Sequence, residues 1–185
     1  MKRKWIAIGF VALVALTIVG VAAAHRLAIV EGTHGDDQLT GTPSTDLILA
    51  RAGNDTVSAQ EGNDFVLAGR GNDSVDGGAG NDRVLGGPGN DTLSGGDGND
   101  GLRGRQGDDT VDGGAGDDRL GSGRGTDTLT GGDGDDKLFM VANDDVVDHA
   151  DCGAGNDVVW VNAAESDVRT NCETVKTVTV TETSG

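Results

Sequence analysis

Aspartate recurs every nine residues over most of this 185-residue chain. Thirteen aspartates share that register: Asp37, Asp46, Asp55, Asp64, Asp73, Asp82, Asp91, Asp100, Asp109, Asp118, Asp127, Asp136 and Asp145. Carboxylates at a regular spacing suit a hard cation such as Ca²⁺, whereas zinc and copper favour nitrogen and sulfur ligands. Two carboxylates can also hydrolyse a glycoside, but proton transfer or nucleophilic attack would conflict with metal ligation at the same groups. The register therefore predicts cation binding rather than catalysis.

The charge balance points the same way. Asp and Glu number 31 against 14 Lys and Arg, which gives a formal net charge of −17. Nucleic acids and anionic lipids are bound through Lys and Arg, so this balance argues against both as partners. The three histidines, His25, His34 and His149, lie in no H-E-x-x-H sequence, and no G-x-S-x-G is present. We predict that the protein is not an enzyme.

The residues around each aspartate form the elements that must position it. An aliphatic residue follows each aspartate by two positions, and glycine precedes it by two, except at Ser44 and Asn143. The resulting unit, G-G-x-G-(N/D)-D-x-(V/L)-x, is best kept at residues 86–94. Glycine permits the positive φ angles of a tight turn, so we expect the first six residues to turn the chain. The last three should form a short strand whose middle aliphatic points inward. A disordered Gly/Asp-rich linker would need no such phased aliphatics.

This unit resembles the nonapeptide repeat of the haemolysin-type (RTX) family, and the resemblance covers thirteen units over residues 32–148. It implies an all-β fold, a right-handed parallel β-roll solenoid in which two units make one 18-residue coil. It also implies that units n and n+2 enclose one calcium ion between them. All thirteen aspartates are then metal ligands, together with loop carbonyls that include those of Gly78, Gly80, Gly87, Gly89, Gly96, Gly98, Gly114, Gly116, Gly132 and Gly134.

The resemblance also sets the expected number of ions. Thirteen loops form eleven n/n+2 pairs, so up to about eleven calcium sites are predicted. The loops that open with Ala50-Arg51, Ala59-Gln60 and Met140-Val141 depart from the glycine pattern. We therefore expect the best sites between Asp64 and Asp136.

Calcium is also expected to control folding. Unmetallated carboxylates in adjacent coils repel each other by roughly 1 kcal/mol per pair in water. One aliphatic side chain per nine residues buries too little apolar surface to offset this repulsion and the backbone entropy. The chain without calcium is therefore predicted to be largely unfolded.

The first 24 residues predict export. Lys2, Arg3 and Lys4 precede an apolar run from 5 to 24 that ends in three alanines, as in a cleaved signal peptide. A signal anchor is the alternative, because about 20 apolar residues can span a bilayer. Either way the remainder lies outside the cytoplasm, secreted or held at the cell surface, and cleavage would leave no membrane contact. Residues 25–31 are expected to form a capping strand.

The C-terminal part departs from the regular period. After Asp148 the phase breaks with an apparent insertion of residues 149–151 and resumes as a fourteenth unit from Cys152 to Trp160. We assign 149–175 to a C-terminal cap and 176–185 to a tail that is either a last edge strand or frayed. Cys152 and Cys172 are the only cysteines, and an even pair in an exported protein predicts a disulfide.

The outward residues of even and odd units fall on opposite faces. The even face is apolar near its N-terminal end and basic further along. Its apolar part, Leu47, Leu49, Phe65, Leu67 and Leu85, suggests a contact surface for a partner, a glycan or a second copy. Two functions follow: a secreted calcium-binding protein whose folding is coupled to extracellular calcium, or a surface- or polysaccharide-binding module in which calcium is structural only.

Overall fold

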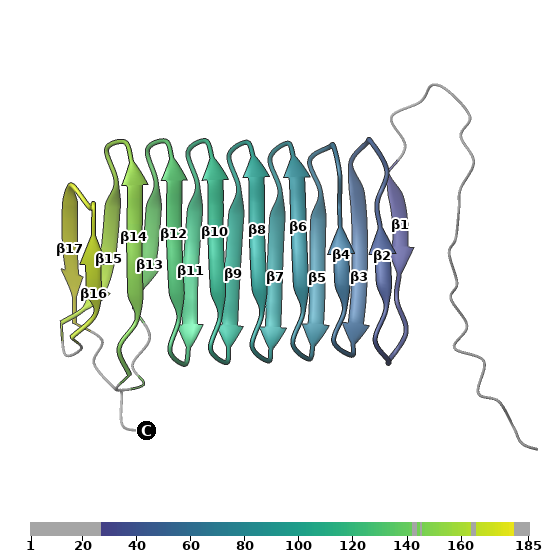
Figure 1. The fold of residues 1–185 in the computed structure, drawn as a ribbon, viewed down its shortest axis with the longest axis horizontal. Coiled ribbons are helices and arrows are strands. Elements are labelled where there is room, and N and C mark those ends of the chain that lie inside the picture. The colour runs from purple at the N-terminus through teal and green to yellow at the C-terminus, as the bar shows by residue number, and fades with distance from the viewer. Residues whose placement is uncertain (1–26, 142–143, 145, 164–165, 180–185) are drawn as a thin grey trace, which may run out of the picture.

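The chain winds into a regular stack of strands, seen in a computed structural model that describes residues 27–141, 144, 146–163 and 166–179 (Figure 1). The described residues form seventeen β-strands and contain no helix. Accordingly, nothing in this part of the chain is a helix long and apolar enough to cross a bilayer. The predicted signal segment, residues 1–24, and the end of the predicted tail lie outside the described residues.

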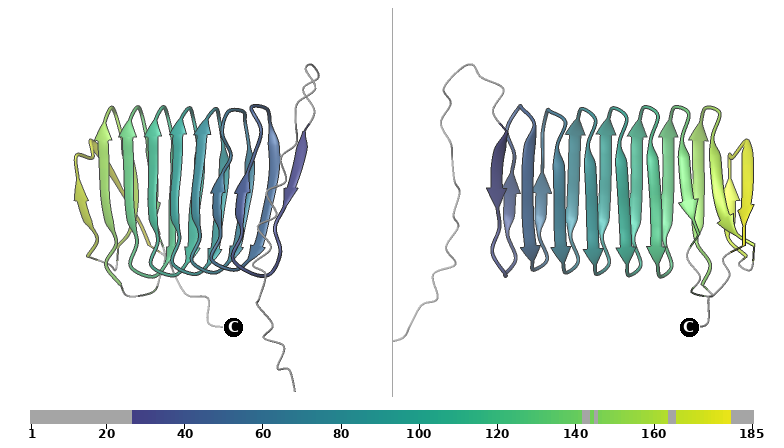
Figure 2. Two further views of the ribbon diagram at one scale, coloured as in Figure 1. Left: turned by 45° about the vertical axis from the view of Figure 1, so that its right-hand side comes forward. Right: turned by 180° about the vertical axis from the view of Figure 1, so that it is seen from behind.

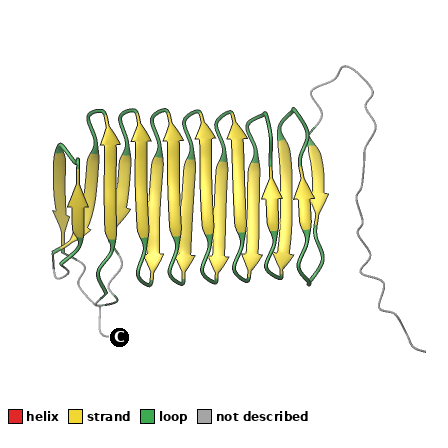
Figure 3. Cartoon of the chain, viewed as in Figure 1, coloured by secondary structure: helices red, strands yellow, loops and turns green. Residues whose placement is uncertain are grey.

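Successive strands alternate between two sheets, and neighbouring strands within each sheet run parallel (Figure 3). The nine-stranded sheet contains, in spatial order, β1 (Ala28–Glu31), β3 (Asp46–Ala52), β5 (Phe65–Arg70), β7 (Arg83–Pro88), β9 (Gly101–Gln106), β11 (Arg119–Arg124), β13 (Lys137–Met140), β15 (Val158–Asn162) and β17 (Thr174–Val178). The eight-stranded sheet contains β2 (Gln38–Thr40), β4 (Thr56–Ser58), β6 (Ser74–Ala79), β8 (Thr92–Asp97), β10 (Thr110–Ala115), β12 (Thr128–Asp133), β14 (His149–Ala154) and β16 (Val168–Thr170).

The register confirms the predicted coil. Val75 lies beside Leu93 in the next coil, and Val84 lies beside Leu102, so residues 18 apart are neighbours in parallel strands. About eight such coils make an all-β parallel solenoid, and views from other directions show the same stack (Figure 2). Ala28–Glu31 pairs with the start of β3, as expected for a strand that begins the stack.

The strands of the central coils are longer than predicted. They span six residues rather than three, as in β6, and the turn that follows is only the three residues 80–82. The first two glycines of the unit therefore belong to the strand. The second of them needs its glycine: Gly78 has φ +97°, and a Cβ there would collide with the carbonyl oxygen of Gln60 in the preceding coil.

Each of these six-residue strands points two residues into the core. The first is the predicted aliphatic, which is fully or almost fully buried from Ile48 through Val57 and Leu102 to Leu138. The second is the residue at position 1 of the following unit, such as Ala68 in β5 or Cys152 in β14. The interior therefore contains two columns of residues per sheet, and only the first of them was predicted from the sequence.

The insertion lies earlier than predicted. His149, Ala150 and Asp151 are not inserted residues but the start of β14, where Ala150 pairs with Leu129 and is buried. The three additional residues lie between β13 and β14. Val147, expected to point inward, is 39% exposed, so that prediction is wrong. It failed because Asp145 and Val147 continue the nine-residue spacing in the sequence, whereas the strand that this spacing predicts begins three residues later, at His149.

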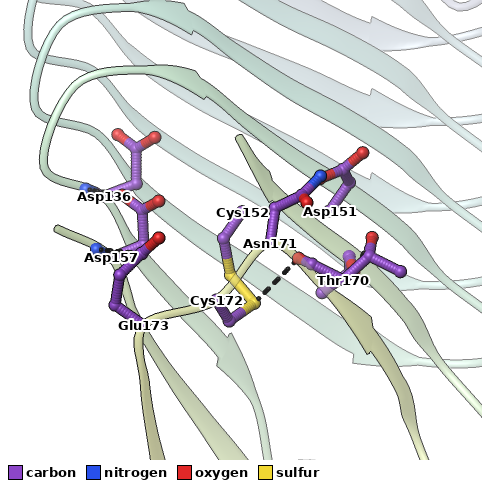
Figure 4. Close-up of a disulfide and its surroundings, with 9 residues drawn as sticks. Asp136, Asp151, Cys152, Asp157, Thr170, Asn171, Cys172 and Glu173 are labelled. Carbon is purple, nitrogen blue, oxygen red and sulfur yellow. Dashed lines mark hydrogen bonds between the residues drawn. A yellow bond between two sulfur atoms is a disulfide. The ribbon is translucent and has the colours of Figure 1, made fainter. Parts of the chain in front are cut away.

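The C-terminal end carries the predicted disulfide between Cys152 and Cys172 (Figure 4). Cys152 occupies the buried position 1 in β14, and Cys172 lies between the short strands β16 and β17. The predicted boundary between cap and tail at residue 175 falls inside β17, which pairs with β15 and forms the last strand of its sheet.

Candidate metal centre

The turns between strands lie along the two edges of the flattened coil (Figure 1). The register aspartates come at the ends of these turns, directly before the next strand, and so form one column along each edge. From Asp55 and Asp64 onward, each aspartate of the two columns accepts a hydrogen bond at Oδ1 from the backbone N–H of the aspartate one coil earlier. The N–H of Asp82, for example, donates to Oδ1 of Asp100 at 2.7 Å, and the N–H of Asp91 donates to Oδ1 of Asp109 at 2.8 Å. The backbone therefore orients every carboxylate in the same way.

The second carboxylate oxygen has no donor. Oδ2 is buried and without a hydrogen-bond partner among the described residues in twelve aspartates: Asp55, Asp64, Asp73, Asp82, Asp91, Asp100, Asp109, Asp118, Asp127, Asp136, Asp157 and Asp167. A buried acceptor without a donor is costly, and an unpaired buried carboxylate is more so. Repetition of the same orphaned atom in successive coils marks the place where a cation fits.

Burial makes these carboxylates reluctant to ionise in the absence of a cation. It raises the pKa of Asp91 to about 7; the N–H of Asp73 lowers it, and the neighbouring charges of Asp109 and Asp73 raise it again. Burial likewise raises the pKa of Asp118 and Asp127 to about 7. Ionisation at neutral pH therefore calls for a compensating positive charge.

The glycine at position 1 borders the space beside Oδ2. A Cβ added to Gly77 would lie 2.7 Å from Oδ2 of Asp82 and 2.6 Å from the carbonyl oxygen of Gly95 in the next coil. Gly86, Gly95, Gly113 and Gly131 repeat this pairing of a carboxylate oxygen with a position-1 carbonyl. Ca²⁺ binds carboxylate and carbonyl oxygens at 2.3–2.6 Å, so the donor set suits calcium. We call this space the cradle.

Several coils fill the cradle with a side chain instead. Position 1 is Ala50, Ala59 and Ala68 in the N-terminal coils, and Met140, Cys152 and Val161 in the C-terminal coils. All six are buried. Glycine leaves the cradle open beside Asp82, Asp91, Asp100, Asp109, Asp118 and Asp136, and also at the N-terminal end, where Gly32 and Gly41 border Oδ2 of Asp37 and Asp46.

The first two aspartates differ from the rest. Oδ2 of Asp37 and Oδ2 of Asp46 accept hydrogen bonds from the backbone N–H groups of Thr33 and Thr42. Threonine occupies position 2 in both units, where later units have glycine or a longer side chain. These two carboxylates are thus satisfied without a cation.

The last predicted aspartate is displaced. Asp145 lies outside the described residues, and Asp148 occupies the column position, accepting from the N–H of Asp127 at 2.9 Å. Asp157 and Asp167 continue the two columns, and Glu173 ends one of them by accepting from the N–H of Asp157 (Figure 4). These four acidic residues were not predicted as site members, because the spacing between residues joined in successive coils changes from 18 to 21, 19 and 16. A search that allowed the period to slip would have found them.

The predicted loop carbonyls fall in two places. Five of these glycines lie inside strands: Gly78, Gly87, Gly96, Gly114 and Gly132. The other five lie in the turns beside the aspartate columns: Gly80, Gly89, Gly98, Gly116 and Gly134. The carbonyls of position 1, including those of Gly95 and Gly113, were not predicted, yet they border the same space as the orphaned oxygens.

A second ladder runs along both edges. The side-chain oxygen of Asn54 accepts from the N–H of Asn72, and that of Asn72 accepts from Asn90, at 2.8 and 2.9 Å. The same bonds join Asn63, Asn81 and Asn99 on the other edge. The periodic Asn or Asp at position 5 was visible in the repeat, but its role in bonding successive turns required the structure.

No group of three or more His, Cys, Asp or Glu side chains converges anywhere in the described part of the chain. A cation between two coils would therefore take carboxylates from two aspartates and complete its shell with backbone carbonyls, which is a calcium-like rather than a zinc-like set.

Comparison with protein-family models agrees with this geometry. The model of the RTX calcium-binding nonapeptide repeat (4 copies) matches residues 31–66, 58–93, 85–120, 94–129 and 112–147. The chain belongs to this family. The RTX repeats account for all but the ends of the described solenoid, and the protein is accordingly a calcium-binding β-roll. No curated protein sequence matches the chain.

Proposed function

We propose that calcium ions bind along both aspartate columns and that their binding folds the chain. The observation that carries this proposal is the column of buried Oδ2 atoms without donors. When bound, calcium supplies the positive charge that these atoms lack. The aspartates and the position-1 carbonyls hold the ion, and the aspartate and asparagine ladders hold successive turns in register.

We further propose that occupancy is uneven. The open cradles beside Asp82, Asp91, Asp100, Asp109, Asp118 and Asp136 are the strongest sites, and the total stays below the eleven predicted from loop pairs. A Cβ fills the corresponding space beside Asp55, Asp64 and Asp73, and threonine N–H groups satisfy Asp37 and Asp46.

The test is a calcium titration of the oxidised, EDTA-treated protein followed by far-UV circular dichroism. We expect a cooperative change from coil to β-structure near the millimolar calcium typical of extracellular modules, with no equivalent change in magnesium. Asp100→Asn should shift the midpoint to higher calcium. Asp97→Asn, which removes an exposed carboxylate from β8 outside the column, is the matched control. A full β spectrum in EDTA at neutral pH would overturn the coupling of folding to calcium.

We also infer that the protein is exported and non-catalytic. The disulfide supports an oxidising compartment outside the cytoplasm, and millimolar calcium is found there. Use of the column carboxylates as metal ligands conflicts with acid–base catalysis by the same groups. Mass spectrometry of protein from the culture medium should find a mature N-terminus at His25. Retention of residues 1–24 in a membrane fraction would instead support the anchor.

A further inference from the structure

Basic side chains are confined to one face of the solenoid. The described residues include ten Lys and Arg, and nine of them lie on strands of the nine-stranded sheet: Arg51, Arg70, Arg83, Arg103, Arg105, Arg119, Arg124, Lys137 and Lys176. Only Arg169, on β16, lies on the other sheet. We call the set of nine the cationic face. A protein with a net charge of −17 thus carries one strongly basic surface.

Most of these arginines have no partner among the residues that the structure describes. Arg51 pairs with Glu31 at 2.6 Å, which is the only salt bridge within the described residues. The side chains of Arg70, Arg83, Arg103, Arg105, Arg119 and Arg124 make no ion pair or hydrogen bond there. Two adjoining grooves on this face share Gly87, Pro88 and Arg105, and both are lined by arginine. The guanidinium groups are available to an anionic partner.

Two residues of the cationic face have strained backbone conformations. Arg51 and Arg105 have φ values of +83° and +98°, in a row that elsewhere consists of Gly69, Gly87 and Gly123. A non-glycine residue in this region costs conformational energy. Glycine would satisfy the fold at both positions, and the uncharged Gln60 has the same conformation at φ +84°, so packing does not call for these arginines and the strain alone does not call for a charge.

The opposite face carries the opposite charge. Asp76, Asp112 and Asp151 are exposed in one row across β6, β10 and β14 of the eight-stranded sheet, and Asp97 and Asp133 are exposed at the ends of β8 and β12. We call these five residues the anionic face. Among the described residues none of the five makes an ion pair, and only Asp151 accepts a side-chain hydrogen bond, from Asn171 at 2.7 Å.

The two faces are matched in spacing as well as in charge. Every coil contributes one strand to each sheet, so both faces repeat at the same strand spacing of about 4.8 Å. Asp76 and Asp112 lie two coils apart in one row, as do Arg83 and Arg119 in a row of the other sheet. A contact made between two flat faces in one coil is therefore repeated further along the stack.

We propose that the cationic face of one copy binds the anionic face of another copy. The contact joins two different surfaces and leaves one free face of each kind, so it extends into an open stack rather than closing as a dimer. Leu67, Leu85 and Phe65 lie beside the arginines and would be covered in the same contact.

This inference rests on the proposed function in one respect. Without calcium the chain would be unfolded, or its aspartate columns would be strongly negative and copies would repel each other. With calcium bound the columns are neutralised and the two faces dominate the interaction. The association should therefore require calcium and weaken as salt screens the charges.

The experiment is sedimentation velocity on the full protein in calcium, at low and at high salt. We expect the wild type to form oligomers that grow with concentration at low salt and dissociate at high salt. One variant, Arg103→Gln/Arg105→Gly/Arg119→Gln, removes three central charges from the cationic face. The other, Asp76→Asn/Asp97→Asn/Asp112→Asn, removes three of the five charges of the anionic face. Each variant alone should remain monomeric, because one of its two surfaces has lost its central charges.

Mixing the two variants gives the decisive result. The intact anionic face of the first fits the intact cationic face of the second, so the mixture should form a 1:1 dimer and nothing larger. Circular dichroism in calcium checks that both variants fold, and loss of folding in the wild type would refute the proposed function instead. A folded wild type that stays monomeric at low salt, or a mixture without dimer, would overturn the association. Binding of an acidic polysaccharide by a monomeric wild type would reassign the cationic face to that ligand.

Discussion

The central coils and the two ends of the solenoid share one repeat but fill their interiors differently. In the centre, position 1 is glycine, as at Gly86 and Gly95, except at the buried Ser122, and the space beside the carboxylates stays open. Towards the ends the same position carries Ala50, Ala59 or Met140, which are buried, and only the first two units return to glycine at Gly32 and Gly41. Under the proposed function, one residue in nine would decide whether a coil is held by a metal or by apolar packing.

The C-terminal end is further reinforced by covalent and aromatic contacts. The disulfide joins β14 to the segment before β17. Phe139 and Trp160 stack with ring centroids 4.6 Å apart, and Lys176 lies 4.8 Å from the Trp160 ring. We therefore expect the centre to depend on calcium and the ends to depend on side chains.

The largest expected effect is that acid replaces calcium in the centre. The pKa values of Asp91, Asp118 and Asp127 are about 7 in the fold against 3.8 for an ordinary Asp, so the folded state binds more protons than the unfolded state. This contribution to stability is complete below the unfolded pKa and is lost as the pH rises through the folded pKa. In EDTA the protein should gain β-structure between about pH 7 and pH 4, as followed by circular dichroism. A spectrum in EDTA that does not change with pH would contradict the role of buried charge.

Removal of the disulfide tests the C-terminal end. The bridge closes a loop with a sequence separation of 20, and Cys152→Ser/Cys172→Ser should lower the free energy of unfolding by about 3 kcal/mol. Urea denaturation in saturating calcium measures the loss. Hydrogen exchange should place the lost protection in β14 to β17 and leave β7 to β10 unchanged. Equal loss throughout would mean that the ends and the centre unfold as one unit.

Closing a central cradle should weaken calcium binding locally. Gly95→Ala places a Cβ between Oδ2 of Asp100 and the carbonyl of Gly113, and we expect about a tenfold higher calcium requirement, or ~1.4 kcal/mol. Gly101→Ala is the matched control, because its Cβ would meet nothing nearer than 3.9 Å. Isothermal titration calorimetry compares the two. Equal effects would show that the cradle is not the binding site.

Opening a terminal cradle is the reverse experiment. Ala59→Gly removes a fully buried methyl group and should destabilise the acid-folded, calcium-free protein by about 1–1.5 kcal/mol. The same change should raise the number of bound calcium ions, because space beside Asp64 becomes free. Native mass spectrometry counts the ions, and an unchanged count would refute the opening.

The smallest expected effect concerns the aromatic stack. Lys176→Met removes the charge over Trp160 and should cost about 0.5–1 kcal/mol, measured by urea denaturation. Lys137→Met changes a lysine on the same sheet that makes no ring contact and should cost less. A larger loss in the control would locate the effect in net charge rather than in the aromatic contact.

The sequence by itself determined the stack and its chemistry. The aliphatic two positions after each aspartate predicted the buried column that includes Val57 and Leu102, the cysteine pair predicted the disulfide, and the family resemblance of the nine-residue repeat implied the parallel coils. These features follow from local rules: glycine permits the turn, and strand alternation points every second side chain inward. Oxygen-rich loops and the family resemblance were enough to indicate calcium.

Only the tertiary structure decided what lies between the coils. That Oδ1 is satisfied and Oδ2 is not, that Asp148 takes the column position, and that position 1 forms or fills the cradle all depend on residues 18 to 21 apart. The same holds for the contrast between Arg105 and its glycine neighbours. A periodic sequence states which residues repeat, but the stacking of one coil on the next determines which atoms are left without partners.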